Sequence, residues 1–329
     1  MTKKLAQSLS PLVGTLRQIA TVRRIVLDDG PENGVRALSF STGGGLEFLA
    51  LSDRTLDIGT LSWQGIQIAW QSPAGFRTPA LIDLESEGGR GFNRGFSGFL
   101  ITCGLNHIRQ PANGEPLHGR LPFTPARLTA YGEDWDRDEP LLYCEGEVVQ
   151  ARYGGEALRL RRRIEAPVGG GTIRITDMVE NLGAEICAQE MLYHFNLGYP
   201  GIAPGTTVEL DGQNLLGPIE LPDDDGLQPA RTWPAQANGT SRCTVVTPSG
   251  ERRLSVSFSF DTRTLSHLQL WRDLRRHTGV LAIEPCSSPL AADGKGKADS
   301  NLAPGERRTY RLEITLSGSP RPLNLPDRS

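Results

Sequence analysis

The chain has 329 residues, of which 38% are hydrophobic and 22% are charged, and its formal net charge is -3. A chain of this length can bury a large core, in one big domain or two ordinary ones. The composition excludes a disordered chain, and the absence of a basic surplus argues against a nucleic-acid partner.

The N-terminal segment, MTKKLAQSLSPLVGTLRQ, carries two lysines, but Ser, Pro and Gly interrupt its apolar stretch. Such a segment is a poor signal peptide, and no later run approaches the length that spans a membrane. We therefore expect a cytoplasmic protein with no membrane partner.

Short segments of alternating apolar and polar residues follow one another between frequent Gly and Pro residues. In chain order they cover residues 35–40, 46–52, 66–70, 141–149, 157–166, 172–180, 253–260 and 310–316. Period-two alternation between turn residues predicts half-buried antiparallel strands. The best helix candidate is TLSHLQLWRDLRRHT, but its first half alternates as well as it rotates, so a strand is an equal alternative.

This pattern predicts an all-β protein, a sandwich or a barrel. We expect one domain over residues 1–329, with residues 1–20 and 318–329 as peripheral ends. The glycine-rich segment GGRGFNRGFSG at 88–98 lacks both the GxGxxG spacing and a GK[ST] sequence, so a corner between strands is expected rather than a phosphate loop.

The five cysteines lie far apart and form no CxxC pair: Cys103, Cys144, Cys187, Cys243 and Cys286. A zinc site or a disulfide framework would need closer or paired spacing. Reduced thiols that act as small core residues are expected instead, with no metal site.

Three residues at the ends of predicted strands could carry acid–base chemistry at neutral pH. Glu284 lies where the apolar run LAIEP breaks, His118 lies in the loop PLHGRLPF, and His194 lies in LYHFNLGYP. A carboxylate and imidazoles are the usual groups for general acid–base catalysis. Taken singly, each residue would more often be a buried group satisfied by a partner than a catalytic one.

Basic side chains could hold an oxygen-rich ligand, because guanidinium offers a planar fork of donors. Arg90 and Arg94 lie in RGFNRGF, where the alternative is a solvated loop. Arg54 and Asp57 in LSDRTLDIG are candidate ligand contacts or a simple ion pair with each other. The lysines at 295 and 297 are expected to be solvated.

Taken together and in order, several segments resemble the aldose 1-epimerase (galactose mutarotase) superfamily, in a less characterised branch. They are GGGLEFLALSDRTLDIGTLSWQGIQIAW, GFNRGFSG, PLHGRL, YHFNLGYP and IEPCSSP…NLAPGE, and they cover roughly residues 35–316. The resemblance implies a large antiparallel β supersandwich that interconverts the α and β anomers of a free sugar without a cofactor.

By motif, the resemblance implies that Glu284 is the base, His194 the acid and His118 a second, polarising histidine. Arg94 would take the place of the family's sugar-binding arginine. His107, in GLNHI, lies close to these motifs in the sequence and could supply a further contact.

The sequence departs from the family pattern at two points. The family carries the acid as His-x-Tyr-Phe-Asn-Leu, whereas His194 directly precedes Phe195. A shift of two keeps the side chain on the same strand face but moves it by roughly 6.5–7 Å. The family's sugar-binding aspartate has no clear match, and Asp211 and residues 223–225 are the only candidates.

Three functions remain as hypotheses. The first is a carbohydrate epimerase that acts at the anomeric carbon of an aldose or a sugar derivative. The second is a non-catalytic sugar-binding or sensing protein on the same fold, because a fold does not fix a function. The third is a 1-epimerase of a phosphorylated or acidic sugar, held by arginines such as Arg77 and Arg90. The sequence leaves the sugar and the oligomeric state open.

Overall fold

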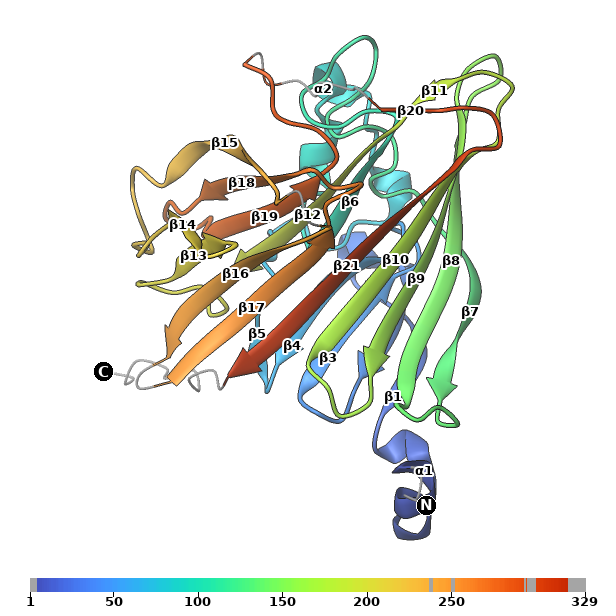
Figure 1. Cartoon of the computed structure of the whole chain (residues 1–329), viewed down its shortest axis with the longest axis vertical. Helices are drawn as coiled ribbons and strands as arrows, with labels where there is room; N and C mark the ends of the chain where they lie inside the picture. The colour runs from blue at the N-terminus through green and yellow to red at the C-terminus, as the bar shows by residue number, and fades with distance from the viewer. Residues whose placement is uncertain (1–4, 237–238, 250–251, 293, 295–299, 319–329) are drawn as a thin grey trace.

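A computed structural model describes residues 5–236, 239–249, 252–292, 294 and 300–318. Lys295, Lys297 and nearly all of the C-terminal end therefore lie outside the described residues. Antiparallel strands dominate the described chain, as the alternation predicted (Figure 1). Among these residues, no helix is both long and apolar enough to cross a membrane.

The largest sheet of the described chain has nine strands and runs diagonally across the molecule in Figure 1. From edge to edge its strands are β14 (Gln213–Leu216), β13 (Thr207–Leu210), β16 (Thr240–Ser249), β17 (Arg252–Asp261), β21 (Arg307–Gly318), β10 (Thr172–Asn181), β9 (Ala157–Pro167), β8 (Leu141–Ala151) and β7 (Arg127–Asp134).

A second sheet, which we name the site sheet, has five strands. They are β15 (Leu227–Pro234), β18 (His267–Asp273), β19 (Val280–Cys286), β12 (Glu190–Gly198) and β6 (Leu100–Leu105). The remaining sheets are β1 (Thr21–Val26), β2 (Arg36–Ser41), β3 (Leu46–Leu51), β4 (Asp57–Trp63) and β5 (Ile66–Gln67), and the pair β11 (Cys187–Ala188) and β20 (Asn301–Leu302).

Within the described residues, helical structure is limited to short turns. They are α1 (Leu5–Leu9), η1 (Ser10–Leu12), η2 (Leu16–Gln18), η3 (Gly30–Glu32), η4 (Pro79–Leu81), α2 (Ser86–Gly89) and η5 (Gly91–Arg94). The segment 88–98, expected as a plain corner, therefore contains helical turns before β6 begins. Figure 1 shows α1 projecting beyond the ends of the strands.

All eight alternating segments overlap strands of the structure. The undecided segment forms β18, because its alternation places Leu268 and Leu270 on one face and Gln269 and Trp271 on the other. The prediction of an antiparallel β sandwich is confirmed.

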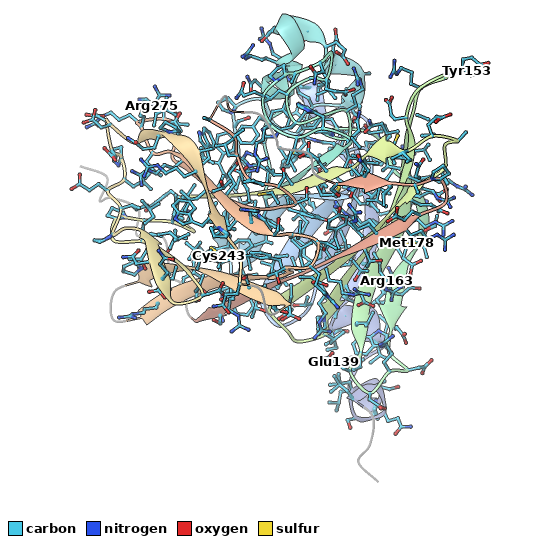
Figure 2. All side chains as sticks on the ribbon, turned by 45° about the horizontal axis from the view of Figure 1, so that its top comes forward. Glu139, Tyr153, Arg163, Met178, Cys243 and Arg275 are labelled. Carbon is cyan, nitrogen blue, oxygen red and sulfur yellow. The ribbon has the colours of Figure 1, made fainter. Side chains whose placement is uncertain are left out.

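The site sheet packs one of its faces against the nine-stranded sheet. Phe195 on β12 contacts Phe258 on β17, with ring centroids 5.0 Å apart, and Phe99 lies beside both rings. Side chains fill the space between the sheets, and the buried Cys243 is one of them (Figure 2). Since neighbouring residues of a strand point to opposite faces, His194 is directed away from this core.

A buried ionic cluster ties three sheets together around Arg162 on β9. Its guanidinium donates to Asp57 on β4 (2.8 Å) and to Asp177 on β10 (2.6 Å). It also donates to the Thr102 hydroxyl on β6 (2.8 Å), and Tyr193 on β12 donates to Asp177 (2.7 Å). Burial alone would lower the pKa of Arg162, but the carboxylates outweigh burial and raise its pKa above the ordinary value.

We expect the substitution Arg162→Met to lower the free energy of unfolding by about 3–5 kcal/mol, because it leaves two carboxylates buried without their cation. Arg163→Met is the matched control, since Arg163 is the next residue and forms partly exposed ion pairs with Glu145 and Glu165. Loss of such surface pairs costs about 1 kcal/mol or less. Urea unfolding of both variants checks this, and equal losses would contradict a special role for the cluster.

Candidate active site

The register of the site sheet brings three polar residues into one row. On β12 and β19, Leu192 lies opposite Cys286 and Phe195 lies opposite Ile283, so His194 and Glu284 occupy facing positions. On β18 and β19, Gln269 pairs directly with Glu284. Facing residues of neighbouring strands point to the same side. The side chains of Gln269, Glu284 and His194 therefore stand next to one another on the face turned away from the core.

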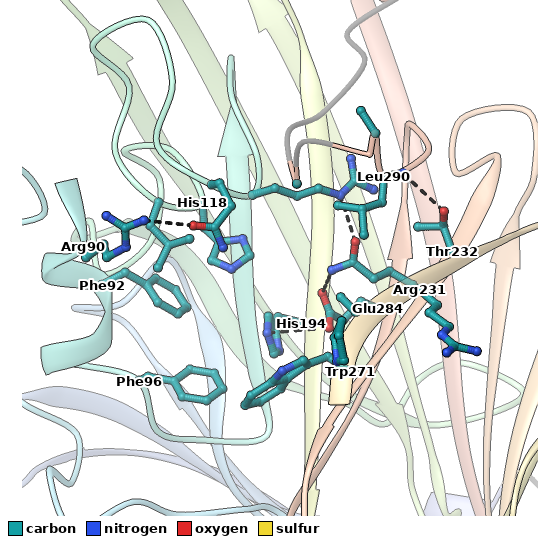
Figure 3. A pocket seen from close by; sticks show the side chains of 18 of the residues that line it. Arg90, Phe92, Phe96, His118, His194, Arg231, Thr232, Trp271, Glu284 and Leu290 are labelled. Carbon is teal, nitrogen blue, oxygen red and sulfur yellow. Dashed lines mark hydrogen bonds and ion pairs between the residues drawn. The ribbon is translucent and has the colours of Figure 1, made fainter. Parts of the chain in front are cut away.

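This row forms the floor of a cavity of about 960 Å³. Three aromatic rings, Phe92, Phe96 and Trp271, stand beside the row, and Arg90 and Arg231 lie on opposite sides of it (Figure 3). Cavities that bind small molecules typically combine such apolar walls with a few convergent polar groups.

The carboxyl group of Glu284 has two unlike oxygens. Its side chain is fully buried, and Oε2 accepts a hydrogen bond from Nε2 of Gln269 (2.6 Å). Oε1 has no hydrogen-bond partner and lies 3.7 Å from Nε2 of His194. A buried oxygen without a partner is uncommon and costs free energy. Oε1 is therefore the atom of Glu284 left available to a ligand.

Asn196 fixes the ring of His194. The amide nitrogen of Asn196 donates to the carbonyl oxygens of Gly98 (3.0 Å) and His194 (3.1 Å), so its Oδ1 must be an acceptor. This Oδ1 lies 2.7 Å from Nδ1 of His194, and Nδ1 consequently carries a hydrogen. Only Nε2, which faces Glu284, is left to give or take a proton.

His118 reaches the same cavity from the loop between β6 and β7. Its ring packs on Phe92 with centroids 4.7 Å apart and meets the ring of His194 edge-on at 5.6 Å. The backbone has a φ of 65°, and Gly119 follows with a φ of 77° where a Cβ would collide with the carbonyl oxygens of Gly104 and His107. The loop therefore needs Gly119 to place His118 against β6.

Burial holds the pKa of His118 well below its ordinary value, and the neighbouring His194 and Arg109 act in the same direction. The imidazole is therefore neutral at pH 7. Its Nδ1 is buried and has no hydrogen-bond partner. A neutral imidazole can polarise a ligand oxygen as a donor or accept a hydrogen bond from it.

This shift predicts a dependence of stability on pH. Below the ordinary pKa of 6.5, the unfolded chain binds a proton that the folded chain does not, so stability falls as the pH falls. The free energy of unfolding of the wild type should fall between pH 7 and about pH 5.5. We expect this fall to be smaller by about 1 kcal/mol in His118→Asn. Asn tolerates the positive φ of this position. Urea unfolding at both pH values checks this, and identical pH slopes in variant and wild type would contradict it.

Arg109 and Gln269 are cavity residues that the sequence did not single out as candidates. The Arg109 side chain is buried, its Nε donates to Oε1 of Gln269 (2.8 Å), and its other nitrogens donate to the Ser288 side chain and to the carbonyls of Ser288 and Pro289. Trp271 was likewise not singled out. Pairing between β18 and β19 brings Gln269 to Glu284, and a single sequence holds no signal for that pairing.

Two of the predicted sugar contacts do not line the cavity. Arg94 is exposed and pairs with Glu87 instead, through its Nε at 2.6 Å from Oε1, while Arg90 from the same segment lies at the cavity. The Nε2 atom of His107 lies 2.9 Å from the carbonyl oxygen of Gln110, and His107 is not among the residues that line the cavity. Both side chains lie outside the cavity lining because each is held by another partner, Arg94 by Glu87 and His107 by the Gln110 carbonyl.

Arg54 and Asp57 also lie away from the cavity lining, and they do not form an ion pair with each other. Asp57 belongs to the buried cluster around Arg162. Arg54 donates to the carbonyl oxygen of Gly95 (2.6 Å) and lies over the ring of Phe123 at 4.4 Å. Burial lowers its pKa to about 10. Arg54 thus holds the segment that carries Phe92 and Phe96 through its hydrogen bond to Gly95.

The two places suggested for a sugar-binding aspartate also lie outside the cavity lining. Asp211, in the turn between β13 and β14, accepts a hydrogen bond from the backbone N–H of Arg242, and residues 223–225 lie in a loop where Asp224 and Asp225 are exposed. Among the described lining residues, Glu284 is the sole carboxylate. No cluster of three or more His, Cys, Asp or Glu residues suited to a metal ion occurs in the described part of the chain.

A comparison with protein-family models matches residues 32–225 to a domain of unknown function, DUF4432. The chain belongs to the DUF4432 family. The region that matches DUF4432 contains His118 and His194 but ends before β18 and β19, which carry Gln269 and Glu284. A comparison with curated proteins found no match.

Solved structures similar to this DUF4432 protein share its fold. One from Klebsiella pneumoniae, provisionally assigned as an aldose 1-epimerase, has a TM-score of 0.79 at 23% identity, over 94% of this chain and 86% of its own. A galactose mutarotase-like protein from Clostridium acetobutylicum has a TM-score of 0.61 at 15% identity, over 91% and 98%. Galactose 1-epimerase from Lactobacillus acidophilus has a TM-score of 0.58 at 12% identity, over 90% and 98%. The fold is therefore of the galactose mutarotase type.

Proposed function

We propose that this protein is an aldose 1-epimerase-like isomerase, which interconverts the α and β anomers of a sugar. Glu284 takes the proton of the anomeric hydroxyl O1, the bond from C1 to the ring oxygen O5 breaks, and His194, which enters the step as an imidazolium with hydrogens on both nitrogens, gives its Nε2 proton to O5. The carbonyl group of the open aldehyde then rotates, and the same steps in reverse close the ring on either face. Atoms and charges balance without a redox partner.

One observation carries this proposal: the unpartnered Oε1 of Glu284 lies 3.7 Å from Nε2 of His194 on the floor of a cavity. O1 and O5 are bonded to the same carbon, so a base for one and an acid for the other must be close neighbours. Positioned acid–base groups of this kind accelerate a proton transfer by about 10²–10⁴-fold. In this proposal the neutral His118, whose ring meets that of His194, polarises the substrate as a second histidine.

The aromatic walls support a sugar as the ligand. Phe92, Phe96 and Trp271 offer apolar surface beside the polar row, and a pyranose ring presents both C–H and hydroxyl groups. Figure 3 shows the three rings on the same side of the cavity as His194.

A second candidate is an isomerase of a sugar that carries an anionic group. Arg90 and Arg231 line the cavity, and Glu284 is the one carboxylate of its described lining. Arginines suit carboxylate and phosphate oxygens because they donate through a planar fork.

The test is exchange NMR of the purified protein with free aldoses, uronic acids and sugar phosphates. Magnetisation transfer between α and β anomeric signals, above the rate without protein, supports the proposal and names the sugar. Transfer restricted to the acidic sugars favours the second candidate. Saturation transfer from protein to sugar without anomer exchange would replace the enzyme with a sugar-binding protein on a mutarotase-type fold.

A further inference from the structure

The cavity floor contains a chain of hydrogen bonds that the proposed reaction does not itself use. Arg109 donates from Nε to Oε1 of Gln269 (2.8 Å), and Gln269 donates from Nε2 to Oε2 of Glu284 (2.6 Å). All three side chains are buried, with exposed fractions of 2%, 4% and 0%. A dashed line at the Glu284 carboxylate in Figure 3 marks its hydrogen bond in this chain.

The direction of the chain is fixed by its first member. An arginine can only donate hydrogen bonds, so the oxygen of the Gln269 amide must face Arg109. The amide nitrogen then faces Glu284 and can only donate to it. A proton on Oε2 of Glu284 would point at the N–H group of Gln269, which is also a donor, so Oε2 must remain an acceptor. Oε1 is therefore the carboxylate oxygen that can take a proton.

Arg109 is itself held so that it cannot turn toward a ligand. Its nitrogens also donate to Ser288 Oγ (3.0 Å) and to the Pro289 carbonyl (3.1 Å). Ser288 Oγ in turn donates to Glu190 Oε1 (2.7 Å). Two buried carboxylates therefore lie one side chain away from the same guanidinium, Glu284 through Gln269 and Glu190 through Ser288. Hydrogen bonds thus connect both carboxylates to one buried cation.

We propose that Arg109 and Gln269 are positioning residues that keep Glu284 ionised, with Oε1 turned toward His194. The catalytic consequence rests on the proposed isomerase function, but the ionisation of Glu284 does not. The two can therefore be tested separately.

The first measurement is ¹³C NMR of protein labelled at the glutamate side-chain carboxyl, with the Glu284 signal identified by its absence in Glu284→Gln. We expect the pH at which this signal moves to its protonated position to rise by at least about one unit in Gln269→Leu, since a hydrogen bond to the charged form is lost. Gln150→Leu is the matched control. Gln150 is also a buried glutamine with two hydrogen bonds, to Leu105 and Asn106, and it does not line the cavity.

An unchanged Glu284 midpoint in Gln269→Leu, or an equal rise in Gln150→Leu, would overturn the proposal. This result is obtained whether or not the protein turns over a sugar, so its failure is distinct from failure of the isomerase function. Arg109→Lys keeps the positive charge but has no planar fork, and we expect it to move the midpoint less than Gln269→Leu does.

The second measurement is the pH profile of anomer exchange. We expect Gln269→Leu to lower kcat by about 10- to 100-fold at neutral pH, the size of a lost hydrogen bond to a charged group. The acid limb of the kcat/KM profile should move to higher pH. A rise in KM alone, with kcat and the acid limb unchanged, would instead make Gln269 a sugar contact and overturn its positioning role.

Discussion

Glu284→Gln should lower the rate of anomer exchange by about 10²–10⁴-fold, the contribution of one positioned base. Gln has nearly the same shape and keeps an oxygen for the Gln269 amide, but an amide cannot take a proton from O1. Because the Glu284 side chain is fully buried beside Gln269, the substitution also removes a buried charge rather than a packing contact. The protein should therefore remain folded.

Exchange NMR at saturating sugar, together with urea unfolding of the same sample, measures this prediction. Glu190→Gln is an informative comparison, because it makes the same change at the buried carboxylate on the other side of Arg109, which does not line the cavity. We expect the Glu190 variant to lose far less activity. Full activity in Glu284→Gln would show that another group is the base.

The second large effect is expected for His194→Asn, which should also slow exchange by about 10²–10⁴-fold. The ring oxygen must receive a proton as the ring opens, and Nε2 of His194 is the nitrogen that faces Glu284. Asn cannot deliver a proton at neutral pH. Binding of the sugar should weaken much less than turnover, because the aromatic walls remain, and a split between kcat and KM measures this difference.

His277→Asn supplies the control for this substitution. His277 lies in the turn between β18 and β19, outside the cavity, and its φ of 66° is one that Asn tolerates. Wild-type rates are expected there. A loss of only a few fold in His194→Asn would transfer the acid role to His118, whose ring meets that of His194 at 5.6 Å.

The strands could be predicted from the sequence because a half-buried strand alternates apolar residues on its core face with polar residues on its other face. The same two-residue period explains why the displaced histidine motif still identified a residue beside Glu284. His194 lies two positions from its place in the family pattern, and a shift of two leaves a side chain on the same face. Glu284 and His194 consequently face each other across β12 and β19.

The predicted sugar contacts lie outside the cavity lining for a different reason. Arg54 and Asp57 lie in a segment that looks like an exposed turn, but Arg162, more than a hundred residues later, covers Asp57 from another sheet. Gln269 and Arg109 could not be predicted from the sequence either. Gln269 meets Glu284 through the pairing of β18 with β19, and Arg109 meets Gln269 from a loop 160 residues earlier in the chain. Partners so distant in sequence leave no local pattern.

Asn196 has a consequence for how the proposed enzyme would return to its starting state. With Nδ1 engaged by Asn196, the imidazole of His194 has a single working nitrogen. The proton that leaves it when the ring opens comes back to the same atom when the ring closes, and the proton on Glu284 returns likewise. Every turnover of the proposed reaction would thus end in the protonation state in which it began, whichever anomer entered. Such a site would need no exchange of protons with water between turnovers and would favour neither direction, so the proposed enzyme would bring the two anomers to their equilibrium ratio in solution.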